Sequence, residues 1–377
     1  MIPNRNRPTG ALARTLPTDR LHPSPAPMES ATAHAAVQDY YGRVLASSAD
    51  LKTTACCSTE DLPARHKAVL ALLPDEVLTK FYGCGSPIPT ALEGKTVLDL
   101  GCGTGRDAFV AAAAAGPDGR VIGLDMTEEQ LDVARRHEAT VAARLGFDRP
   151  TTEFVQGYIE DLAGAGIADA SVDVVISNCV LNLSPDKPRV FAEMLRVLKP
   201  GGEVYVSDVF CDRRLPAEAM DDAVLLGECL GGAMYTEDFR RLLADLGVPE
   251  YRTVSERPIE VTDESIRHAL GAARFVSRTV RAFKLDVLED LCEDYGQTAT
   301  YRGGAAGMEH RFVLDDHHTF EAHRPERVCG NTAAMLQDTR LAAYFDVAGS
   351  RERHFGLFAC GPTLAHTDAD AAGGSCC

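Results

Sequence analysis

The sequence lacks tryptophan, lacks any Cys-x-x-Cys motif, and has no uninterrupted apolar run of the roughly 20 residues that a membrane-spanning helix needs. The N-terminal stretch also lacks the apolar segment of a signal peptide, so a cytoplasmic protein is expected. Twelve cysteines are present, but in a reducing compartment they do not suit a disulfide framework, and their spacing does not suit a zinc knuckle. These absences leave soft-metal or redox chemistry for part of the cysteines.

Positive charge is also in short supply. The chain carries 38 Lys and Arg against 55 Asp and Glu, a net charge of −17. The basic residues are interleaved with acids, as in Arg135-Arg136-His137-Glu138, and form no basic cluster. Neither a nucleic-acid partner nor an anionic membrane surface is therefore expected, and we expect a soluble monomer.

The length of 377 residues, 45% of them hydrophobic, allows one large core and a smaller unit. Prolines and arginines predict a disordered arm over residues 1–36, followed by a large α/β domain over residues 37–285. Short strand-like runs predict a small α+β domain over residues 286–348. Residues 349–377 are expected to form a flexible tail that contains cysteine.

Predicted strands and helices alternate through the large domain, which is typical of a Rossmann-like, mostly parallel, doubly wound sheet with helices on both faces. Apolar runs predict strands at Thr96–Leu100, Arg120–Asp125, Thr152–Gln156, Val172–Ser177 and Glu203–Val209. Helices are expected over Val37–Leu45, from about Arg65 to Gly83, from Thr127 to Leu145, and over Pro188–Leu198 and Ala333–Tyr344. Two later candidates, Tyr251–Val261 and Phe275–Phe283, would complete the sheet in antiparallel orientation.

A glycine-rich turn follows the first predicted strand, in the segment Asp99-Leu100-Gly101-Cys102-Gly103-Thr104-Gly105. A loop that cradles dinucleotide phosphates has the spacing Gly-x-Gly-x-x-Gly, whereas this turn has Gly-x-Gly-x-Gly. S-adenosylmethionine has no phosphate, so it needs only positions without Cβ against which its ribose and methionine moieties can lie. Asp125, at the end of the second predicted strand, is placed to accept both ribose hydroxyls. The pattern indicates a class I S-adenosylmethionine-dependent methyltransferase; a purely structural turn is the alternative.

Three cysteines lie in predicted loops around the same edge of the sheet. Cys179 follows a strand that ends at the carboxyl edge, where open α/β sheets bind ligands. Cys229 lies in a glycine-rich turn, and Cys84 lies between two glycines just before the first strand. Residues on loops that a rigid scaffold positions often bind ligands or take part in catalysis. A role in core packing is the alternative for these three thiols.

Five stretches of sequence resemble one family, the arsenite methyltransferases. They are Phe81–Pro89, Gly123–Thr127, Gly157–Glu160, Ser177–Lys187 and Gly227–Gly232. The resemblance runs from about residue 37 to 285 and continues more weakly to about residue 344. It implies a methyltransferase domain that includes the arsenic-binding loops, followed by a small C-terminal domain. It also implies that arsenite and methylated arsenicals are the substrates, that mono- and dimethylated arsenicals are formed, and that the activity detoxifies arsenic.

The resemblance also implies the roles of individual residues. Cys179, Cys229 and Cys56 would bind As(III), and Cys56 would work with Cys84 as a disulfide relay that thioredoxin or glutathione reduces; Cys57 could replace Cys56. Cofactor contacts carried over residue by residue fall on Tyr82, Gly101, Gly103, Gly105, Asp125, Met126, Gln130, Ile159, Glu160 and Asn178. Core packing is the alternative for Tyr82 and Met126, and a capping box with Thr127 is the alternative for Gln130.

The expected chemistry accounts for the choice of ligand. As(III) is soft, so thiolates are its favoured ligands. Arsenic bound by three sulfurs keeps a lone pair that can attack the sulfonium methyl group, so no general base is needed. Because the transfer formally oxidises arsenic to As(V), two electrons must be supplied before the next transfer.

The sequence departs from the family at two positions and leaves other functions open. The family usually has tryptophan where this chain has Leu226 and Thr236, which predicts a wider or less shielded acceptor cavity. One alternative function is methylation of an oxygen, nitrogen or carbon acceptor such as a quinone or sterol. Another is a metalloid-binding buffer without turnover. Cys102, Cys211 and Cys292 are expected to be inert, buried thiols.

Overall fold

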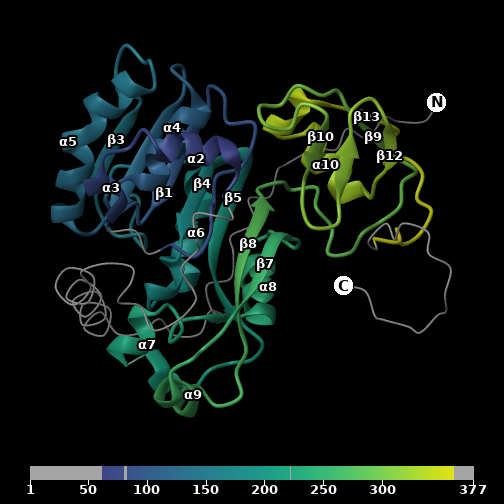
Figure 1. Cartoon of the computed structure of the whole chain (residues 1–377). Coiled ribbons are helices and arrows are strands. Elements are labelled where there is room, and N and C mark those ends of the chain that lie inside the picture. The colour runs from purple at the N-terminus through teal and green to yellow at the C-terminus, as the bar shows by residue number, and fades with distance from the viewer. Residues whose placement is uncertain (1–61, 80–82, 221, 361–377) are drawn as a thin grey trace, which may run out of the picture.

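The computed structural model describes residues 62–79, 83–220 and 222–360 (Figure 1). The predicted arm, the predicted helix Val37–Leu45, Cys56, Cys57 and Tyr82 lie outside these ranges, as do residues 361–377. Within the described ranges, no helix has both the length and the apolar character needed to cross a membrane.

An eight-stranded sheet organises the larger part of the molecule. Its strands follow the order β3-β2-β1-β4-β5-β8-β7, and β6 pairs with β5. The bounds are β1 Thr96–Leu100, β2 Arg120–Asp125, β3 Thr152–Gln156, β4 Val172–Asn178, β5 Leu198–Cys211, β6 Met234–Tyr235, β7 Arg252–Ile259 and β8 Phe275–Phe283. Strands β1 to β6 pair in parallel, whereas β8 and β7 are antiparallel. The predicted fold class and the antiparallel completion of the sheet are confirmed.

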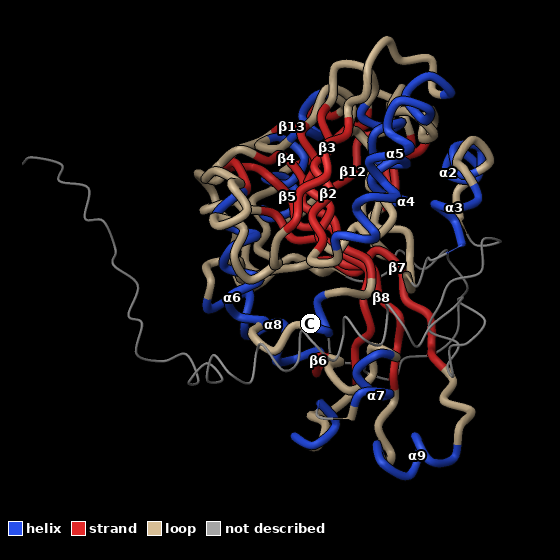
Figure 2. Tube along the Cα trace, turned by 90° about the vertical axis from the view of Figure 1, so that its left-hand side faces the viewer, coloured by secondary structure: helices blue, strands red, loops and turns tan. Residues whose placement is uncertain are grey.

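Helices cover both faces of this sheet, as Figure 2 shows with α4 and α5 on one side and α6 and α8 on the other. The bounds are α2 Ala64–Leu70, α3 Asp75–Thr79, α4 Arg106–Ala115, α5 Glu128–Arg144, α6 Lys187–Val197, α7 Ala223–Gly227, α8 Thr236–Asp245 and α9 Glu264–Leu270. Each face has its own apolar core: Phe191 and Phe239 belong to one, and Phe109 and Leu131 to the other. Central strands buried on both sides explain the nearly continuous apolar runs of β1 and β4.

Several local predictions differ from the structure. The helix expected from Arg65 to Gly83 is two short helices, α2 and α3, separated near Pro74. The capping box at the start of α5 does not form, because the Thr127 N–H and side chain bond to Asp125 instead. The helix expected over Ala333–Tyr344 is α10, Gly330–Gln337, followed by a separate 3₁₀ turn, η7, at Arg340–Ala343.

The C-terminal region, residues 286–360, builds a separate core from aromatic side chains. Its strands are β9 Thr298–Tyr301, β10 Arg311–Val313, β11 Thr319–Glu321, β12 Pro325–Arg327 and β13 Phe345–Ala348. They form a three-stranded sheet, β12-β9-β13, and the hairpin β10-β11. Rings of Tyr301, Phe312, Phe320 and Phe345 pack at centroid distances of 5.1 to 5.4 Å. The structure therefore has the small C-terminal domain that the resemblance implies, while the domain boundaries stay predictions.

A buried ion-pair cluster joins the C-terminal region to the large sheet. Glu203 on β5 accepts a hydrogen bond of 2.7 Å from Arg281 Nε on β8 and pairs with Arg340 of η7. Arg340 also donates to the carbonyl oxygens of Thr90 and Ala91, at 3.1 Å each. Because the Glu203 carboxylate is fully buried, these two arginines provide its counter-charge in place of water.

Candidate active site

A cavity opens at the carboxyl ends of β1, β2 and β4, the edge where doubly wound sheets bind ligands. Of the cofactor contacts expected from the sequence, its walls contain Gly101, Gly103, Asp125, Met126, Gln130, Ile159, Glu160 and Asn178. Cys179, an expected arsenic ligand, lines the same cavity. The structure thus brings these residues together around one space, which we call the cleft.

The glycine-rich turn takes a shape that side chains resist. Gly101, Gly103 and Gly105 all have positive φ, at 69°, 54° and 86°. A Cβ at Gly103 would lie 2.7 Å from Gln130 Oε1, and one at Gly101 would lie 2.4 Å from the Val180 side chain. The first two glycines therefore let the cleft walls close over the turn. Gly105 has a different place: it precedes α4 and packs toward Phe154, outside the cleft lining.

The Asp125 carboxylate is held in a fixed orientation at the end of β2. Its two oxygens accept backbone hydrogen bonds from Gly103 at 2.9 Å and from Thr127 at 2.8 Å. Burial raises the pKa of Asp125, and these hydrogen bonds oppose that shift. The Thr127 side chain also bonds to this carboxylate, so the expected ribose contact would share its oxygens with donors from the protein.

Asp99 is a cleft residue that the sequence reasoning did not assign. One of its carboxylate oxygens is buried with no hydrogen-bond partner in the structure, and it belongs to the cleft wall. Burial, followed by the neighbouring charges of Asp107 and Asp125, raises the pKa of Asp99 well above its ordinary value. The signal was present, because this acid is the penultimate residue of the first strand and lies next to the glycine turn, much as Asp125 ends the second strand. A cationic ligand group would satisfy this oxygen.

Asn178 connects the cleft to Cys84. At the end of β4, its Oδ1 accepts the N–H groups of Cys84 and Gly85 at 3.0 and 3.1 Å, and its Nδ2 donates to Asp107 at 2.7 Å. These hydrogen bonds hold the Cys84 loop close to Cys179, the residue that follows Asn178. Asn178 is both a cleft wall residue and the clamp that brings two expected active-site cysteines together.

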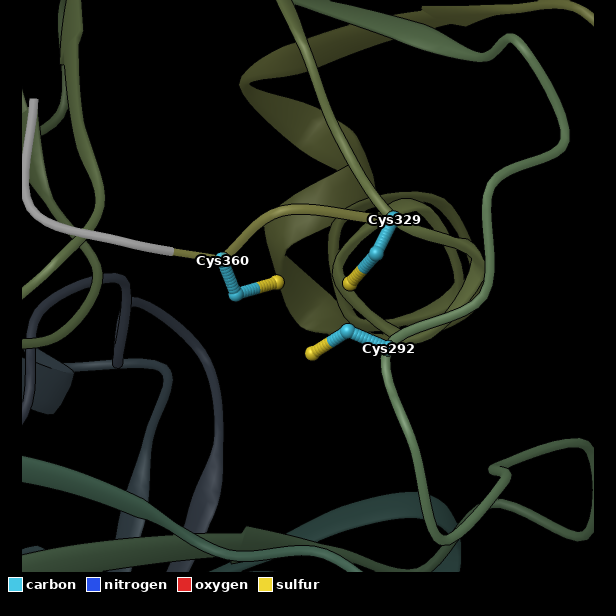
Figure 3. A group of neighbouring side chains, drawn as sticks. All are labelled: Cys292, Cys329 and Cys360. Atoms are coloured by element: carbon cyan, nitrogen blue, oxygen red, sulfur yellow. The ribbon is translucent and has the colours of Figure 1, made fainter. Parts of the chain in front are cut away.

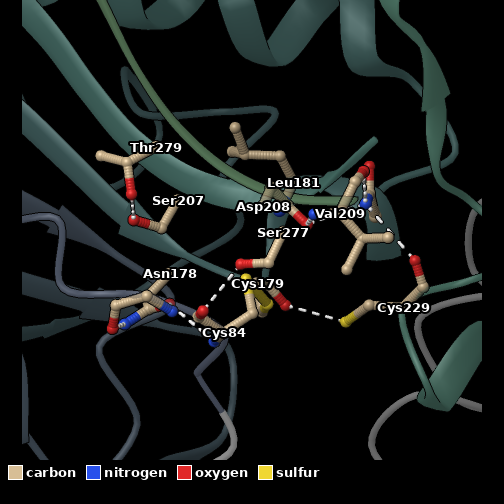
Figure 4. The surroundings of a disulfide bond; sticks show 12 residues. Cys84, Asn178, Cys179, Leu181, Ser207, Asp208, Val209, Cys229, Ser277 and Thr279 are labelled. Atoms are coloured by element: carbon tan, nitrogen blue, oxygen red, sulfur yellow. Dashed lines mark hydrogen bonds between the residues drawn. A yellow bond between two sulfur atoms is a disulfide. The ribbon is translucent and has the colours of Figure 1, made fainter. Parts of the chain in front are cut away.

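Cys84 and Cys179 are joined by a disulfide whose Cα atoms are 5.8 Å apart (Figure 4). The sequence reasoning placed Cys84 with Cys56 in a relay and Cys179 among the arsenic ligands, and did not anticipate this pair. Cys56 lies outside the described residues, so its role as relay thiol and third ligand stays a prediction. A sulfur in a disulfide cannot bind As(III) as a thiolate, so this bond must be reduced before Cys179 can act as a ligand.

Cys179 and Cys229 share an unusual backbone conformation and contact each other. Both have positive φ, 57° and 59°, which non-glycine residues seldom adopt and which is concentrated at functional sites. The Cys229 thiol donates to the Cys179 carbonyl oxygen at 3.2 Å (Figure 4). The loops that follow β4 and α7 therefore bring the Cys229 sulfur against the backbone of Cys179.

Two buried ionisable groups border these cysteines. A carboxylate oxygen of Asp208 lies within 4.8 Å of the Cys84 and Cys179 sulfurs, and burial raises the pKa of Asp208 to about 7. Burial lowers the pKa of Lys187 to about 8, and its ammonium group donates to the carbonyl oxygens of Asn182 and Ser184. The sequence analysis did not identify Asp208 as a site residue. Its sequence signal was an acidic residue within an otherwise apolar strand.

The cysteines expected to be inert divide into two groups. Cys102 and Cys211 are buried in apolar cores, and burial raises the pKa of both thiols, that of Cys211 to about 11. The predicted burial is confirmed for both; Cys102 also lines the cleft, and the inertness of the two thiols stays a prediction. Cys292 does not, because its sulfur belongs to a group of three.

Comparisons with known proteins agree with this site. Residues 91–247 match a methyltransferase domain family, and residues 295–368 match the arsenite methyltransferase C-terminal domain. The chain is 52% identical over 347 residues to the arsenite methyltransferase of Aquipseudomonas alcaligenes, covering 91% of this chain and 100% of that protein. It is 40% identical over 312 residues to the arsenite methyltransferase of Homo sapiens, covering 82% of each.

A solved structure extends the likeness to three dimensions. The crystal structure of CrArsM, an arsenic(III) S-adenosylmethionine methyltransferase from Chlamydomonas reinhardtii, superposes with a TM-score of 0.76 at 49% identity. The match covers 79% of this chain and 99% of that chain. Together with the glycine turn, the strand-end acids and the paired cysteine loops, these findings show that the chain belongs to the arsenite methyltransferase family.

Proposed function

We propose that this chain transfers methyl groups from S-adenosylmethionine to trivalent arsenic held by the thiolates of Cys179 and Cys229, giving mono- and dimethylated arsenicals. One observation carries the proposal: Cys179 lines the cofactor cleft, while the Cys229 thiol touches its backbone. An atom bound by both sulfurs would therefore lie beside the cofactor.

The cleft suits a cationic cofactor better than a phosphate-bearing one. Among the described residues, its walls contain four acidic side chains, Asp99, Asp107, Asp125 and Glu160, and one basic side chain, Arg106. Arg106 is paired with Asp107 at 3.2 Å. S-adenosylmethionine supplies an electrophilic methyl group on a positively charged sulfur, together with an amino group that the unpartnered oxygen of Asp99 can accept.

The residues of the cleft would act by position. Once the thiolates of Cys179 and Cys229, with Cys56 as the proposed third ligand, hold As(III), the arsenic lone pair attacks the methyl carbon. An As–C bond forms, the C–S bond breaks, and the departing sulfide takes the bonding pair. No proton moves in this step, so proximity and alignment carry the catalysis.

Reduction completes the cycle. The transfer raises arsenic formally from As(III) to As(V), and two thiols restore As(III) by supplying two electrons and becoming a disulfide. We propose Cys56 and Cys84 as that pair, with thioredoxin or glutathione returning the disulfide to thiols. The Cys84–Cys179 disulfide gives the same reductant a second task, because Cys179 must be a thiolate before arsenite can bind.

Arsenic speciation tests the proposal directly. The reduced full-length protein is incubated with arsenite, S-adenosylmethionine carrying a deuterated methyl group, and either thioredoxin with its reductase or glutathione. We expect deuterated mono- and dimethylated arsenicals by liquid chromatography with mass detection, and none when cofactor or thiol is left out. Arsenite that is bound in stoichiometric amounts but recovered unmethylated would instead identify a metalloid buffer. Methylation of a quinone under conditions that leave arsenite unchanged would identify a different acceptor class.

A further inference from the structure

A second group of cysteines lies in the C-terminal region, where the sulfurs of Cys292, Cys329 and Cys360 all lie within 4.8 Å of one another. Figure 3 shows the three side chains pointing toward a common centre from three separate segments. We call them the C-terminal trio. None of them lines the cleft, and no disulfide joins any two of them. Their spacing in the sequence matches no metal-binding motif, so the sequence did not reveal this group.

Backbone hydrogen bonds hold the segments of the trio in place. Phe358 N donates to Cys292 O at 2.7 Å, and Cys360 N donates to Phe358 O at 2.9 Å, so the Cys360 segment lies against the Cys292 segment. Gly330 N, next to Cys329, donates to Glu293 O at 2.9 Å. Backbone hydrogen bonds between the segments of the C-terminal region thus bring the three thiols together.

The surroundings of Cys329 favour a thiolate. Cys329 is the N-cap of α10, and its sulfur accepts the Thr332 N–H at 3.4 Å, where the helix dipole favours negative charge. Arg252 Nη2 lies 3.8 Å from the same sulfur, although this guanidinium also pairs with Glu250 and Asp315. Cys329 is fully buried, whereas Cys292 and Cys360 are half-buried and lie nearer to solvent.

The number of ligands distinguishes the soft ions that three thiols could bind. A structural zinc site is almost always four-coordinate and tetrahedral. Among the described residues, no histidine, aspartate or glutamate joins the three sulfurs within 4.8 Å. As(III) takes three ligands in a pyramid and needs no fourth. Thiolates bonded at about 2.3 Å to one ion in a pyramid lie about 3.5 Å apart, so sulfurs that lie within 4.8 Å of one another would close around it by a movement of about 1 Å.

We propose that Cys292, Cys329 and Cys360 form a second As(III)-binding site, separate from the cleft, that holds inorganic arsenite without methylating it. Binding exchanges the three hydroxyls of arsenous acid for three cysteine sulfurs; each hydroxyl leaves as water with the proton of a thiol, or with a solvent proton where the sulfur is already a thiolate, and the oxidation state does not change. The choice of arsenic as ligand rests on the proposed function, since the chain would meet arsenite as its substrate. No methyl transfer is expected there, because the trio is not part of the cofactor cleft.

Arsenite titration of a full-length variant with a silenced cleft tests this site. In Cys179→Ser/Cys229→Ser, arsenite is added to the reduced protein without cofactor, unbound arsenite is removed, and arsenic per chain is measured by mass spectrometry. We expect one equivalent to remain, with three sulfur neighbours by arsenic X-ray absorption. Adding Cys292→Ser or Cys360→Ser should weaken binding by at least about tenfold, as expected when a ligand is lost. Cys211→Ser, which removes a buried thiol outside the trio, is the matched control.

Specific outcomes would overturn the inference. Absence of bound arsenic in the cleft-silenced variant would do so, as would loss of the remaining equivalent on changing Cys376 and Cys377, but not Cys292 or Cys360. Stoichiometric zinc in the protein as purified, lost in Cys292→Ser, would assign the trio to zinc. Circular dichroism of each variant separates lost ligation from lost folding. Because no arm of this titration contains cofactor, its result is independent of whether the wild-type protein methylates arsenite.

Discussion

The cysteines of the cleft and the C-terminal trio are held in contrasting ways. At the cleft, Cys179 lines the wall and Cys229 contacts it, both have positive φ on loops at the edge of a parallel sheet, and a disulfide occupies the sulfur of Cys179. In the trio, Cys329 caps a helix in extended backbone conformation, with φ of −71°, and the segments of its partners are fixed by backbone hydrogen bonds. Left-handed loops are typical of sites where geometry serves function at a cost in backbone energy.

The contrast between the cleft and the C-terminal trio indicates that sulfur ligands alone do not determine whether bound arsenic is methylated. Both groups offer thiols to a soft ion, but only the cleft places them beside acidic walls, a glycine turn and a sheet edge suited to a cationic cofactor. We infer that the same ligand type supports transfer in one place and retention in the other.

Replacing Cys179 by serine has the largest expected effect, a complete loss of methylated product. Serine oxygen is a harder and poorer ligand for As(III) than thiolate, and the arsenic would lose its connection to the cleft. Arsenic speciation after reaction with cofactor and thiol measures the loss. Cys211→Ser is the control, since this thiol is buried in the same apolar cluster and donates to the carbonyl oxygens of Arg213 and Ala233, as a hydroxyl can. Undiminished turnover in Cys179→Ser would erase the contrast between the two groups.

Glu203→Gln tests whether the two regions form one cooperative body. The variant keeps the side-chain shape but leaves Arg281 and Arg340 without their buried counter-charge. We expect the free energy of unfolding to fall by about 3–5 kcal/mol, measured by urea denaturation. The exposed pair Arg120–Glu153 provides the control, where Glu153→Gln should cost less than about 1 kcal/mol. Two separate transitions in wild type, with only one shifted by Glu203→Gln, would show that the regions unfold independently.

The sequence predicted the large sheet well because its strands follow local rules. Apolar runs such as Val172–Ser177 and a glycine turn after Leu100 identify buried parallel strands and a cofactor loop without knowledge of the rest of the chain. The expected cofactor contacts cluster for the same reason, since strand ends at one sheet edge must meet.

Long-range sulfur contacts could not be predicted in this way. The Cys84–Cys179 bond spans 95 residues and depends on the Asn178 clamp, and the trio depends on backbone pairing between two irregular segments. Neither leaves a periodic pattern in the sequence. The capping box failed for a related reason: Thr127 had a stronger partner in Asp125, which only the fold brings near.

His66 offers a pH-dependent test of the junction between the regions. It lines the cavity that Cys84 and Met308 also line, and neighbouring Arg65 donates to Ala306 O at 3.0 Å. Burial lowers the pKa of His66 to about 4, from the ordinary 6.5 of the unfolded chain. Between these values the unfolded state binds the proton and the folded state does not. Stability therefore falls as pH drops from 6.5 to 4, by up to roughly 3 kcal/mol, and the loss is complete below the folded pKa.

The measurement compares urea denaturation of wild type with that of His66→Gln across pH 4 to 7. The variant has no imidazole to protonate, so the difference in unfolding free energy between the two proteins should change with pH only within this window. A difference that is constant with pH would mean that the ring is protonated equally in both states, and that the junction is open to water.

Thr332→Val has the smallest expected effect and acts on the C-terminal trio alone. The Thr332 hydroxyl lies 3.2 Å from the Cys329 sulfur and accepts from Arg252 Nη2 at 3.1 Å, so it connects the guanidinium to the thiol. Valine keeps the shape and removes that link. In the cleft-silenced variant, arsenite affinity should fall by about 0.5–1.5 kcal/mol, or roughly two- to tenfold, as for one hydrogen bond. Thr319→Val, on an exposed edge strand, should change nothing. Equal effects of both would show that the thiol environment does not tune the trio, whereas loss of all binding would make Thr332 a requirement for folding of the site.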